Sequence, residues 1–332
     1  MVQPLRLPGN IQLQAAIGLP NCLRLTNGRV ELIATTDVGP RVVRYGFAGG
    51  ENVLGECPRD SVLTELGEFK PWGGHRLWAA PEDKPKSYAP DNAPVKYHSE
   101  AERSVRLVPP LEEATGLQKE LTVTLDRVGS SVRVQHRITN HNEREIELAL
   151  WALTIMRGGG VAILPQEPFR AHSEYLLPAR PLVLWHYTDL SDPRWTLGAK
   201  FIRLRTDDER KDPQKIGIAN KQGWAAYHVA QTLFVKHFAY EEGATYPDYG
   251  SNNEIFTAAS FIEVESLAPL RRLRQGESAE HVEHWSLFDS VRLAEDDDGA
   301  EAALRGCLKS PLYPVSADLR ASRLSISRVI VA

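Results

Sequence analysis

Short segments in which apolar and polar residues alternate dominate the chain. Two clear examples are GRVELIAT at 28–35 and VRVQHRITN at 132–140. In the second, every other position from Val132 to Ile138 is apolar or histidine, as in a strand with one buried face. Clusters of Gly, Asn and Pro separate such segments, and this spacing is typical of antiparallel hairpins and meanders.

Segments of this kind recur over most of the chain. The pattern also predicts strands at 41–47, 120–128, 146–156, 180–187, 199–206, 223–229, 232–240, 260–267 and 281–288. A dozen or more strands without intervening helices predict an all-β fold, one large antiparallel sandwich with few helices, over residues 1–290. The best helical pattern lies at 294–308, where an acidic start suits a helix N-terminus. We therefore expect residues 291–332 to form a C-terminal appendage that is partly helical.

Composition narrows the class of protein. The 332 residues are 42% hydrophobic and 25% charged, which is ordinary for a globular chain. The net charge is −4, and the sequence shows no sign of the clustered basic face that binds nucleic acid. The three cysteines are far apart and form no CxxC pair, so neither a disulfide framework nor a zinc ribbon is indicated. The N-terminal residues lack a signal-peptide pattern, and no apolar run reaches 18 residues. We expect a cytoplasmic protein with no membrane partner.

Cofactor and metal motifs are missing from the sequence. It contains no dinucleotide fingerprint, P-loop, HExxH or GxSxG. His281 and His284 are three residues apart, which on a strand places them on opposite faces and makes them poor ligands of one metal. No dense Asp/Asn run supports calcium. We expect no cofactor and no metal.

The stretch KPWGGHRLWAAPE at 70–82 concentrates aromatic and basic residues around a Gly-Gly pair. The side chains in this stretch that could bind a ligand are those of Trp72, His75, Arg76 and Trp78. One interpretation is the packed base of a loop. The other is a sugar platform, in which Trp faces stack on sugar C–H groups while Arg and His donate hydrogen bonds, since Trp and Arg are enriched at buried binding sites.

A second stretch, YPDYGSNNEIFT at 246–257, holds Asp248, Asn252, Asn253 and Glu254. Its Gly-Ser-Asn-Asn run is typical of a turn. Its closeness to the acidic strand that follows also allows a functional interpretation.

That acidic strand is FIEVESL at 261–267. Alternation places Phe261, Glu263 and Glu265 on one face. The face could be solvated, but the apolar flanks favour a cleft, where a carboxylate beside an aromatic ring has a raised pKa suited to proton transfer. Two ionised carboxylates on one face repel, so one needs a cation or a proton. Arg76 and Lys236 are the candidate cations, and we expect Glu265 to orient a neighbour such as Arg76.

Taken in order, several stretches resemble the galactose mutarotase-like (aldose 1-epimerase) superfamily over roughly residues 20–290. NGRVELIATTDVGPRVVRYGF resembles its opening strands, KPWGGHRLWAAPE its Gly-Gly substrate loop, and VRVQHRITNHNEREIELALWAL its central hairpin. FIEVESLAPL with GESAEHVEHWSLF resembles the terminal stretch, where a catalytic Glu precedes a turn and a last strand. The resemblance is to an uncharacterised bacterial branch, and it implies a β-supersandwich.

The resemblance also implies chemistry. Glu263 matches the catalytic base, which removes the O1 proton of a sugar while an acid protonates the ring oxygen. The family acid is a His in the central hairpin, but Trp151 stands at its expected place. His75 is then the first candidate acid, with Lys236 or His237 behind it. The predicted site is one concave cleft that comprises catalytic Glu263 and His75 with substrate-binding Trp72, Arg76, Trp78, Trp151, Lys236, Asn253 and Glu265.

Three functions stay open at this point. The first is a carbohydrate-active protein that binds a sugar in a β-sheet cleft and interconverts its anomers by acid/base catalysis. The second is a carbohydrate-binding protein without catalysis, which the missing His favours. The third is a glycan lyase or hydrolase on the same fold, which rests on analogy alone. In each case the partner is a sugar or oligosaccharide.

Overall fold

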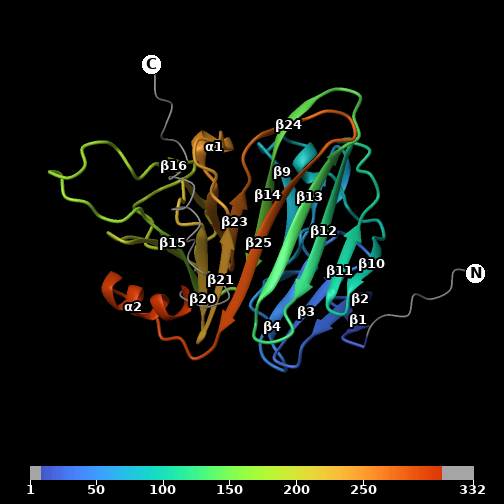
Figure 1. The fold of residues 1–332 in the computed structure, drawn as a ribbon, viewed down its shortest axis with the longest axis horizontal. Coiled ribbons are helices and arrows are strands. Elements are labelled where there is room, and N and C mark those ends of the chain that lie inside the picture. Colours follow the sequence, from blue (N-terminus) through green and yellow to red (C-terminus); the bar gives the residue numbers. More distant parts are fainter. Residues whose placement is uncertain (1–8, 309–332) are drawn as a thin grey trace, which may run out of the picture.

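Two large antiparallel sheets form the body of the protein (Figure 1). The structure is a computed structural model, and it describes residues 9–308. Residues 1–8 and 309–332, which include the end of the expected C-terminal appendage, lie outside the described residues.

The first sheet has 11 strands. Their hydrogen-bonded order is β1-β2-β3-β4-β9-β14-β23-β22-β19-β16, and β24 pairs with β14. The strands span Ile11–Ala16 (β1), Leu19–Thr26 (β2), Val30–Thr35 (β3), Val42–Phe47 (β4), His75–Ala80 (β9), Ile146–Met156 (β14), Leu182–Leu184 (β16), Gln214–Ile218 (β19), Asn253–Ala258 (β22), Phe261–Leu267 (β23) and Arg271–Leu273 (β24).

The second sheet has 10 strands in the order β10-β11-β12-β13-β25-β21-β20-β15-β18-β17. They span Lys96–Ala101 (β10), Ser104–Val108 (β11), Leu117–Leu125 (β12), Val132–Asn140 (β13), Gly160–Pro165 (β15), Trp195–Leu197 (β17), Phe201–Arg205 (β18), Trp224–Val229 (β20), Thr232–Phe238 (β21) and Ser278–Phe288 (β25).

Small elements complete the fold. Two short ribbons pair β5 with β8 and β6 with β7. The remaining elements are Glu56–Cys57 (β5), Val62–Thr64 (β6), Gly67–Phe69 (β7), Trp72–Gly73 (β8), the 3-10 turn Lys86–Tyr88, the short turn Pro247–Gly250 (α1) and the helix Asp297–Leu308 (α2).

The predicted fold is confirmed: within residues 9–308 the regular secondary structure is almost entirely antiparallel β-sheet, with few helices. The predicted strands at 132–140 and 261–267 are β13 and β23, with the bounds that the alternation gave. The helix expected at 294–308 begins three residues later, at Asp297, where the first turn carries two aspartates. Within the described residues no helix is long and apolar enough to cross a membrane.

The main core lies between the two sheets, because each sheet turns one set of alternating side chains toward the other. Leu150 and Val264 of the first sheet join Val134 and Trp285 of the second in this core. The opposite, outer face of the first sheet carries a smaller cluster around Trp78 and Trp151.

The outer face of the second sheet is partly covered by α2. Ala300, Leu304 and Cys307 of this helix pack with Trp224 and Phe201 in a separate cluster. Figure 1 shows α2 beside β15 and β20, at the end of the molecule farthest from β1 and β2. The outer face of the first sheet stays free of helix α2. Most of the predicted site residues lie on the two faces of that sheet, whereas Lys236 lies on β21 of the second sheet and Trp72 on β8.

Candidate functional site

A row of side chains crosses the outer face of the first sheet on four neighbouring strands. Register places Glu254 of β22 opposite Glu265 of β23, Glu265 opposite Leu153 of β14, and Leu153 opposite Arg76 of β9. Side chains that stand opposite one another on one sheet face are within contact range. Glu263 lies on the same face, two residues before Glu265. The two acids of FIEVESL therefore share a face with Arg76, as expected.

Arg76 is the cation of Glu263. Its Nη2 atom lies 3.5 Å from Glu263 Oε1, and both side chains are about nine-tenths buried. The guanidinium also stands over the rings of Trp78, at 4.5 Å, and Phe69, at 5.4 Å. Burial raises the pKa of Glu263 to about 7, because it outweighs the lowering effect of Arg76. A carboxyl group with such a pKa can accept and release a proton near neutral pH.

Glu265 has other partners. Its Oε2 atom accepts hydrogen bonds from Trp151 Nε1 at 2.7 Å and Lys215 Nζ at 3.0 Å. Lys215 is also ion-paired to Glu254 at 2.8 Å and lies between the rings of Trp151 and Trp185. Burial opposes the charge on Lys215, but the two carboxylates outweigh it and raise the pKa of Lys215 well above its ordinary value. The expectation that Glu265 orients Arg76 is wrong, because β19 supplies a nearer cation.

Less buried aromatic and acidic side chains surround this row. The Tyr88 hydroxyl donates a hydrogen bond to Glu82 at 2.8 Å, and both residues belong to the Pro-rich loop at 81–94. Tyr187 is 42% exposed, and its electrostatic neighbours are Lys215, Glu265, Glu82 and Glu254. The outer row thus has a partly open aromatic rim.

Several buried polar atoms of the outer row lack a partner. Arg76 Nε and Nη1, Glu254 Oε1 and Glu265 Oε1 make no hydrogen bond within the described residues. Leaving a buried polar group unpaired costs about 1–3 kcal/mol, so such groups are uncommon and need an explanation. Donors and acceptors that face the same surface are what a polyhydroxylated ligand would satisfy.

His75 and Lys236 lie elsewhere, and the expected single cleft is wrong in this respect. The strand β9 begins at His75 itself, so His75 and Arg76 leave opposite faces of the sheet. His75 and Lys236 are fully buried between the two sheets. His237, the neighbour of Lys236, leaves the opposite face of β21 and lines a pocket of about 930 Å³ beside α2.

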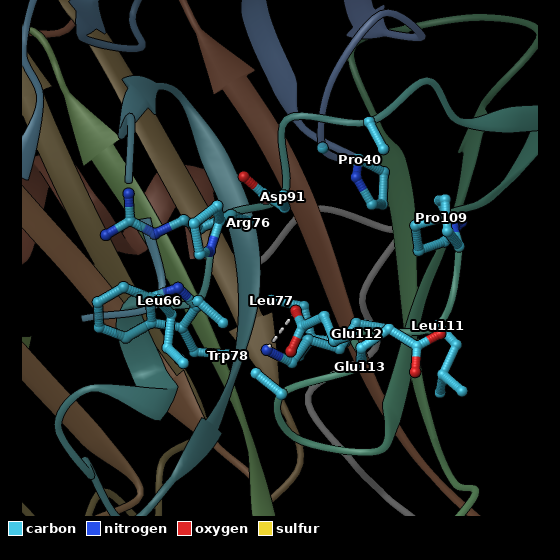
Figure 2. A pocket seen from close by; sticks show the side chains of 17 residues that line it. Pro40, Leu66, Arg76, Leu77, Trp78, Asp91, Pro109, Leu111, Glu112 and Glu113 are labelled. Atoms are coloured by element: carbon cyan, nitrogen blue, oxygen red, sulfur yellow. Dashed lines mark ion pairs between the residues drawn. The ribbon is translucent and has the colours of Figure 1, made fainter. Parts of the chain in front are cut away.

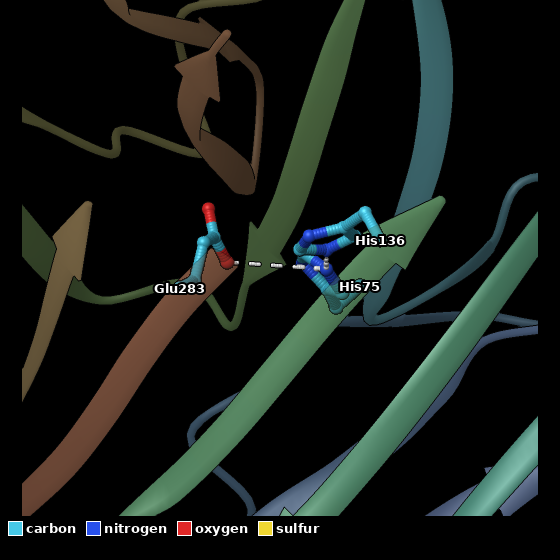
Figure 3. A group of neighbouring side chains, drawn as sticks. All are labelled: His75, His136 and Glu283. Atoms are coloured by element: carbon cyan, nitrogen blue, oxygen red, sulfur yellow. Dashed lines mark hydrogen bonds and ion pairs between the residues drawn. The ribbon is translucent and has the colours of Figure 1, made fainter. Parts of the chain in front are cut away.

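The inter-sheet residues form one hydrogen-bonded network. Lys236 Nζ donates to Glu283 Oε1 at 2.7 Å and to Thr154 Oγ1 at 2.8 Å. His75 bonds Thr154 through Nδ1 at 2.8 Å. Through Nε2 it bonds His136 at 2.6 Å, and Figure 3 shows these two rings beside Glu283. Burial lowers the pKa of His75 well below its ordinary value, so the ring is neutral.

The partners in this network determine which atom donates in each hydrogen bond. His136 Nδ1 faces the carbonyl oxygen of His281 at 3.0 Å, so Nδ1 is the donor and the neutral ring has a bare Nε2. His75 Nε2–H then donates to His136, and His75 Nδ1 accepts the Thr154 hydroxyl proton. Every member has a partner in this scheme.

His75, His136 and Glu283 have donor atoms within 4.8 Å of one another, a spacing that could also surround a metal ion. Two features favour the hydrogen-bonded interpretation. The lone pair of His136 Nε2 is already occupied by His75, and Lys236 already neutralises Glu283. A dication would add uncompensated charge in a site with no exposure to solvent. We assign the cluster a structural role.

Trp72 and Asn253 also stand apart from the outer row. Trp72 packs beside the cluster of Cys22, Ile33 and Val43 near the β1–β4 end of the sheet. Asn253 is fully buried; its amide group donates to the Glu265 carbonyl oxygen at 2.6 Å and accepts from Asn220. Among the substrate-binding predictions, the structure therefore brings Arg76, Trp78, Trp151 and Glu265 together around Glu263.

A pocket of about 320 Å³ opens beside the row. Arg76 and Trp78 form one wall, and Glu112 and Glu113 lie across from them (Figure 2). Glu112 is paired with Lys119 at 2.7 Å. Arg76 therefore stands between Glu263 and a cavity that is large enough for part of a small ligand.

Sequence reasoning missed Lys215 and did not select Glu254 or Asp248. Lys215 lies near the start of the short strand QKIGI, directly after a charged stretch, so the local sequence does not distinguish it from an exposed lysine. Its partners come from β22 and β23, about 40 and 50 positions later, and only the order β19-β22-β23 reveals the contact.

Comparisons with known proteins agree on the fold. No model of a protein family matches the chain, and no curated protein matches it either. A galactose mutarotase-like protein from Lactobacillus casei is similar over 81% of this chain and all of its own, with a TM-score of 0.52 and 11% identity. A galactose mutarotase related enzyme from Lactobacillus acidophilus is similar over 81% of this chain and 98% of its own (TM-score 0.51, 7% identity).

A TPR-domain containing protein from Parabacteroides distasonis is similar over 83% of this chain, with a TM-score of 0.55 and 13% identity. This chain spans about half of that protein, covering 49% of it. At such identities the likeness concerns the fold. The described chain has the galactose mutarotase-like fold, as its sequence predicted.

Proposed function

We propose that this protein binds a sugar on the outer face of the first sheet and interconverts its anomers, with Glu263 as the base. The observation that carries the proposal is the surroundings of Glu263: a buried carboxyl group beside Arg76, with a pKa of about 7, next to unpartnered polar atoms of Arg76 and Glu265. The fold supports it, because proteins named as galactose mutarotase-like share this architecture.

In this proposal the aromatic and polar side chains divide the work. Trp78 and Trp151 support the sugar from below, and Arg76 and Glu265 bind its hydroxyl groups. Trp151 is held by its hydrogen bond to Glu265, so that its ring has a fixed orientation. Glu263 takes the proton of O1 while the C1–O5 bond breaks with its electron pair moving to O5, and O5 takes a proton from water. After rotation about C1–C2 the C1–O5 bond forms on the other face, O5 loses its proton to water, and Glu263 returns its proton to O1. A positioned base contributes on the order of 10²–10⁴ to the rate.

A second candidate function is sugar binding without catalysis. The observation that favours it is the burial of the row, since Trp151 is 3% exposed and Glu265 is fully buried. A site this enclosed admits a ligand only at its partly open rim, near Glu263 and Tyr187. We retain a cytoplasmic location as part of the proposal, on the sequence argument alone.

The test compares Glu263→Gln with the natural protein. Polarimetry on freshly dissolved α-anomers of neutral hexoses measures catalysis above the spontaneous rate, and saturation-transfer NMR measures binding. We expect the variant to lose at least about 100-fold in rate while its far-UV circular dichroism is unchanged. Glu147→Gln, which alters an exposed acid on β14, is the matched control.

Two results would decide against the proposal. Full catalysis by Glu263→Gln would remove Glu263 as the base. Binding without any acceleration by the natural protein would select the non-catalytic function, and the absence of both would end the sugar proposal for the hexoses tested.

A further inference from the structure

The loop between β15 and β16 forms a projecting arm, residues 167–180, at the end of the molecule that carries α2 (yellow-green in Figure 1). Its base is closed, because Arg180 Nε donates a hydrogen bond to the Glu167 carbonyl oxygen at 2.9 Å. Its tip contains a turn, in which the backbone N–H of Glu174 donates to the Ala171 carbonyl oxygen at 2.9 Å. Long loops whose ends lie close together are frequently functional.

The arm exposes large apolar side chains to solvent. Phe169 is 79% exposed, Leu176 is 74% exposed and Leu177 is 70% exposed. Nine of the fifteen large hydrophobic side chains that are exposed within residues 9–308 lie between Phe169 and Leu197. Concentrated apolar surface marks an interaction site, whereas scattered single residues do not. The arm and the strands β16 and β17 that follow it therefore form a candidate contact surface.

The pocket of about 930 Å³ beside α2 lies at the base of the arm. Phe169 of the arm lines it, together with Phe201, Trp224 and Leu304 of the apolar cluster that α2 joins. Its volume lies within the range of roughly 300–1,000 Å³ for pockets that enclose small ligands, so it has room for a few side chains of a loop tip. Lys221 also lines the pocket; it is exposed and makes no ion pair within the described residues.

One chain thus carries both a projecting apolar tip and an open apolar pocket at the same end. A twofold axis at this end would place each tip in the pocket of the other copy, and reciprocal contacts of this kind close into a dimer. The surface is also large enough. Twenty-three residues of 168–197 are exposed, and a standard protein interface uses about 20–30 residues on each side.

The charges of the two surfaces fit a second copy. The arm holds two acids and two bases, so two arms do not repel each other. At the tip, Glu174 directly precedes the three apolar residues 175–177, and its charge is complementary to that of Lys221 at the pocket. Residues 309–332, which follow Leu308 at the pocket wall, are the alternative occupant. They carry four basic residues and one acid, so their charge does not complement Lys221.

We propose that this protein forms a twofold homodimer in which the arm of each copy inserts Leu176 and Leu177 into the pocket beside α2 of the other copy. The inference goes beyond the proposed sugar chemistry and does not depend on it. The pocket lies on the outer face of the second sheet, whereas Glu263 lies on the outer face of the first.

Sedimentation velocity over a concentration series measures the mass and the dissociation constant of the full-length protein. We expect twice the mass of one chain. The double variant Leu176→Asp with Leu177→Asp should raise the dissociation constant at least about 30-fold, because it places two charges where the dimer buries apolar anchors. Its far-UV circular dichroism should be unchanged, since both side chains are exposed in the single chain. Leu13→Asp is the matched control, on a leucine that is 52% exposed on β1 at the opposite end of the molecule.

A disulfide experiment locates the arm. Chains with Leu177→Cys and chains with Lys221→Cys carry tags of different length; they are mixed, allowed to exchange partners and oxidised. We expect a disulfide between the two kinds of chain. Leu13→Cys in place of Leu177→Cys is the control and should give none. A chain that carries both changes shows whether the arm instead fills its own pocket, because the disulfide would then form within a monomer.

Charge reversal tests the pairing of Glu174 with Lys221. Glu174→Lys and Lys221→Glu should each weaken the dimer about two- to fivefold, as for other solvent-exposed ion pairs. The two changes together should restore the natural dissociation constant, because the pair is then re-formed with opposite charges.

Four results would overturn the proposal. The first is a full-length protein that sediments as a monomer, as it would if residues 309–332 occupied the pocket. The second is a dimer that the two aspartates at 176 and 177 leave intact. The third is the absence of a disulfide between the mixed chains, or its formation only within single chains. The fourth is a combined charge reversal that weakens the dimer as much as the two single changes together.

Discussion

Lys236→Met tests the buried network between the sheets. Lys236 Nζ has three acceptors: Glu283 Oε1 at 2.7 Å, Thr154 Oγ1 at 2.8 Å and the Val264 carbonyl oxygen at 3.0 Å. Both members of the Lys236–Glu283 pair have no solvent exposure. Methionine keeps much of the apolar stem, so the change removes mainly the ammonium group.

The expected loss follows from the charge left behind. Glu283 keeps two donors, Ser266 and Trp285, but its negative charge remains in a dry core without a cation. Removing one partner of a buried ion pair costs about 3–5 kcal/mol. We therefore expect Lys236→Met to lower the free energy of unfolding by about this amount.

The companion variant is the double change Lys236→Met with Glu283→Gln. Glutamine carries no charge. Its amide oxygen can still accept from Trp285, and its NH2 group can donate to the Ser266 hydroxyl oxygen in place of the bond that Ser266 donates to Glu283. The double variant should therefore be more stable than the sum of the two single changes predicts, by at least about 1 kcal/mol. Such coupling identifies the uncompensated charge as the source of the loss.

Urea unfolding followed by tryptophan fluorescence measures these effects, and Trp285, which bonds Glu283, reports on the network itself. The control is Arg272→Met, which breaks the exposed pair with Glu147 and should cause no resolvable change. A loss below about 1 kcal/mol in Lys236→Met would refute the reasoning, because the Glu283 charge would then be tolerated alone. So would full additivity in the double variant.

Three further predictions concern stability. Burial lowers the pKa of His281 to about 3, so between pH 6.5 and 3 the unfolded chain binds a proton that the folded chain does not. The free energy of unfolding should therefore fall over this range as the pH falls, by up to about 1.4 kcal/mol per pH unit. In His281→Gln the urea midpoint should depend less on pH. Gly74→Ala should lower the free energy of unfolding by at least about 1–3 kcal/mol. The φ angle of Gly74 is +66°, and a Cβ atom there would lie 2.1 Å from the Val42 carbonyl oxygen. An unchanged melting temperature would contradict this prediction. Trp151→Phe should cost about 1–3 kcal/mol in urea unfolding by removing a donor to buried Glu265, and a neutral result would mean that Lys215 alone suffices.

The alternation of apolar and polar residues predicts most of the strands of the fold. It predicts β13 and β23, which each turn one face to the inter-sheet core, while β14 is predicted by its long apolar run, which is buried on both faces. It also placed Glu263 and Glu265 on one face, which depends only on the period of a strand. These features are local, so a single sequence contains them.

The predicted site residues lie on opposite faces of the first sheet, and the local sequence pattern could not predict this separation. Residues 70–82 were interpreted as a loop around the Gly-Gly pair, in which His75 and Arg76 could point the same way. In the structure β9 starts immediately after Gly74, and strict alternation separates them. Lys236 could equally have faced outward, since its neighbours Val235 and His237 do not show which face of the strand is buried, and the pairing of β21 with β25 brings it to Glu283. Contacts of this kind depend on pairing between distant strands.

The directional network between the sheets has a consequence for how the sandwich is aligned. Two purely apolar faces can slide past each other by part of a residue spacing, since one methyl contact replaces another at small cost. The bonds from His75 to His136 and from Lys236 to Thr154 span the gap between the sheets, and a translation of either sheet would break them together. These bonds fix the position of one sheet on the other. A redesign that filled this space with leucine could gain stability and yet lose this single alignment of the two sheets.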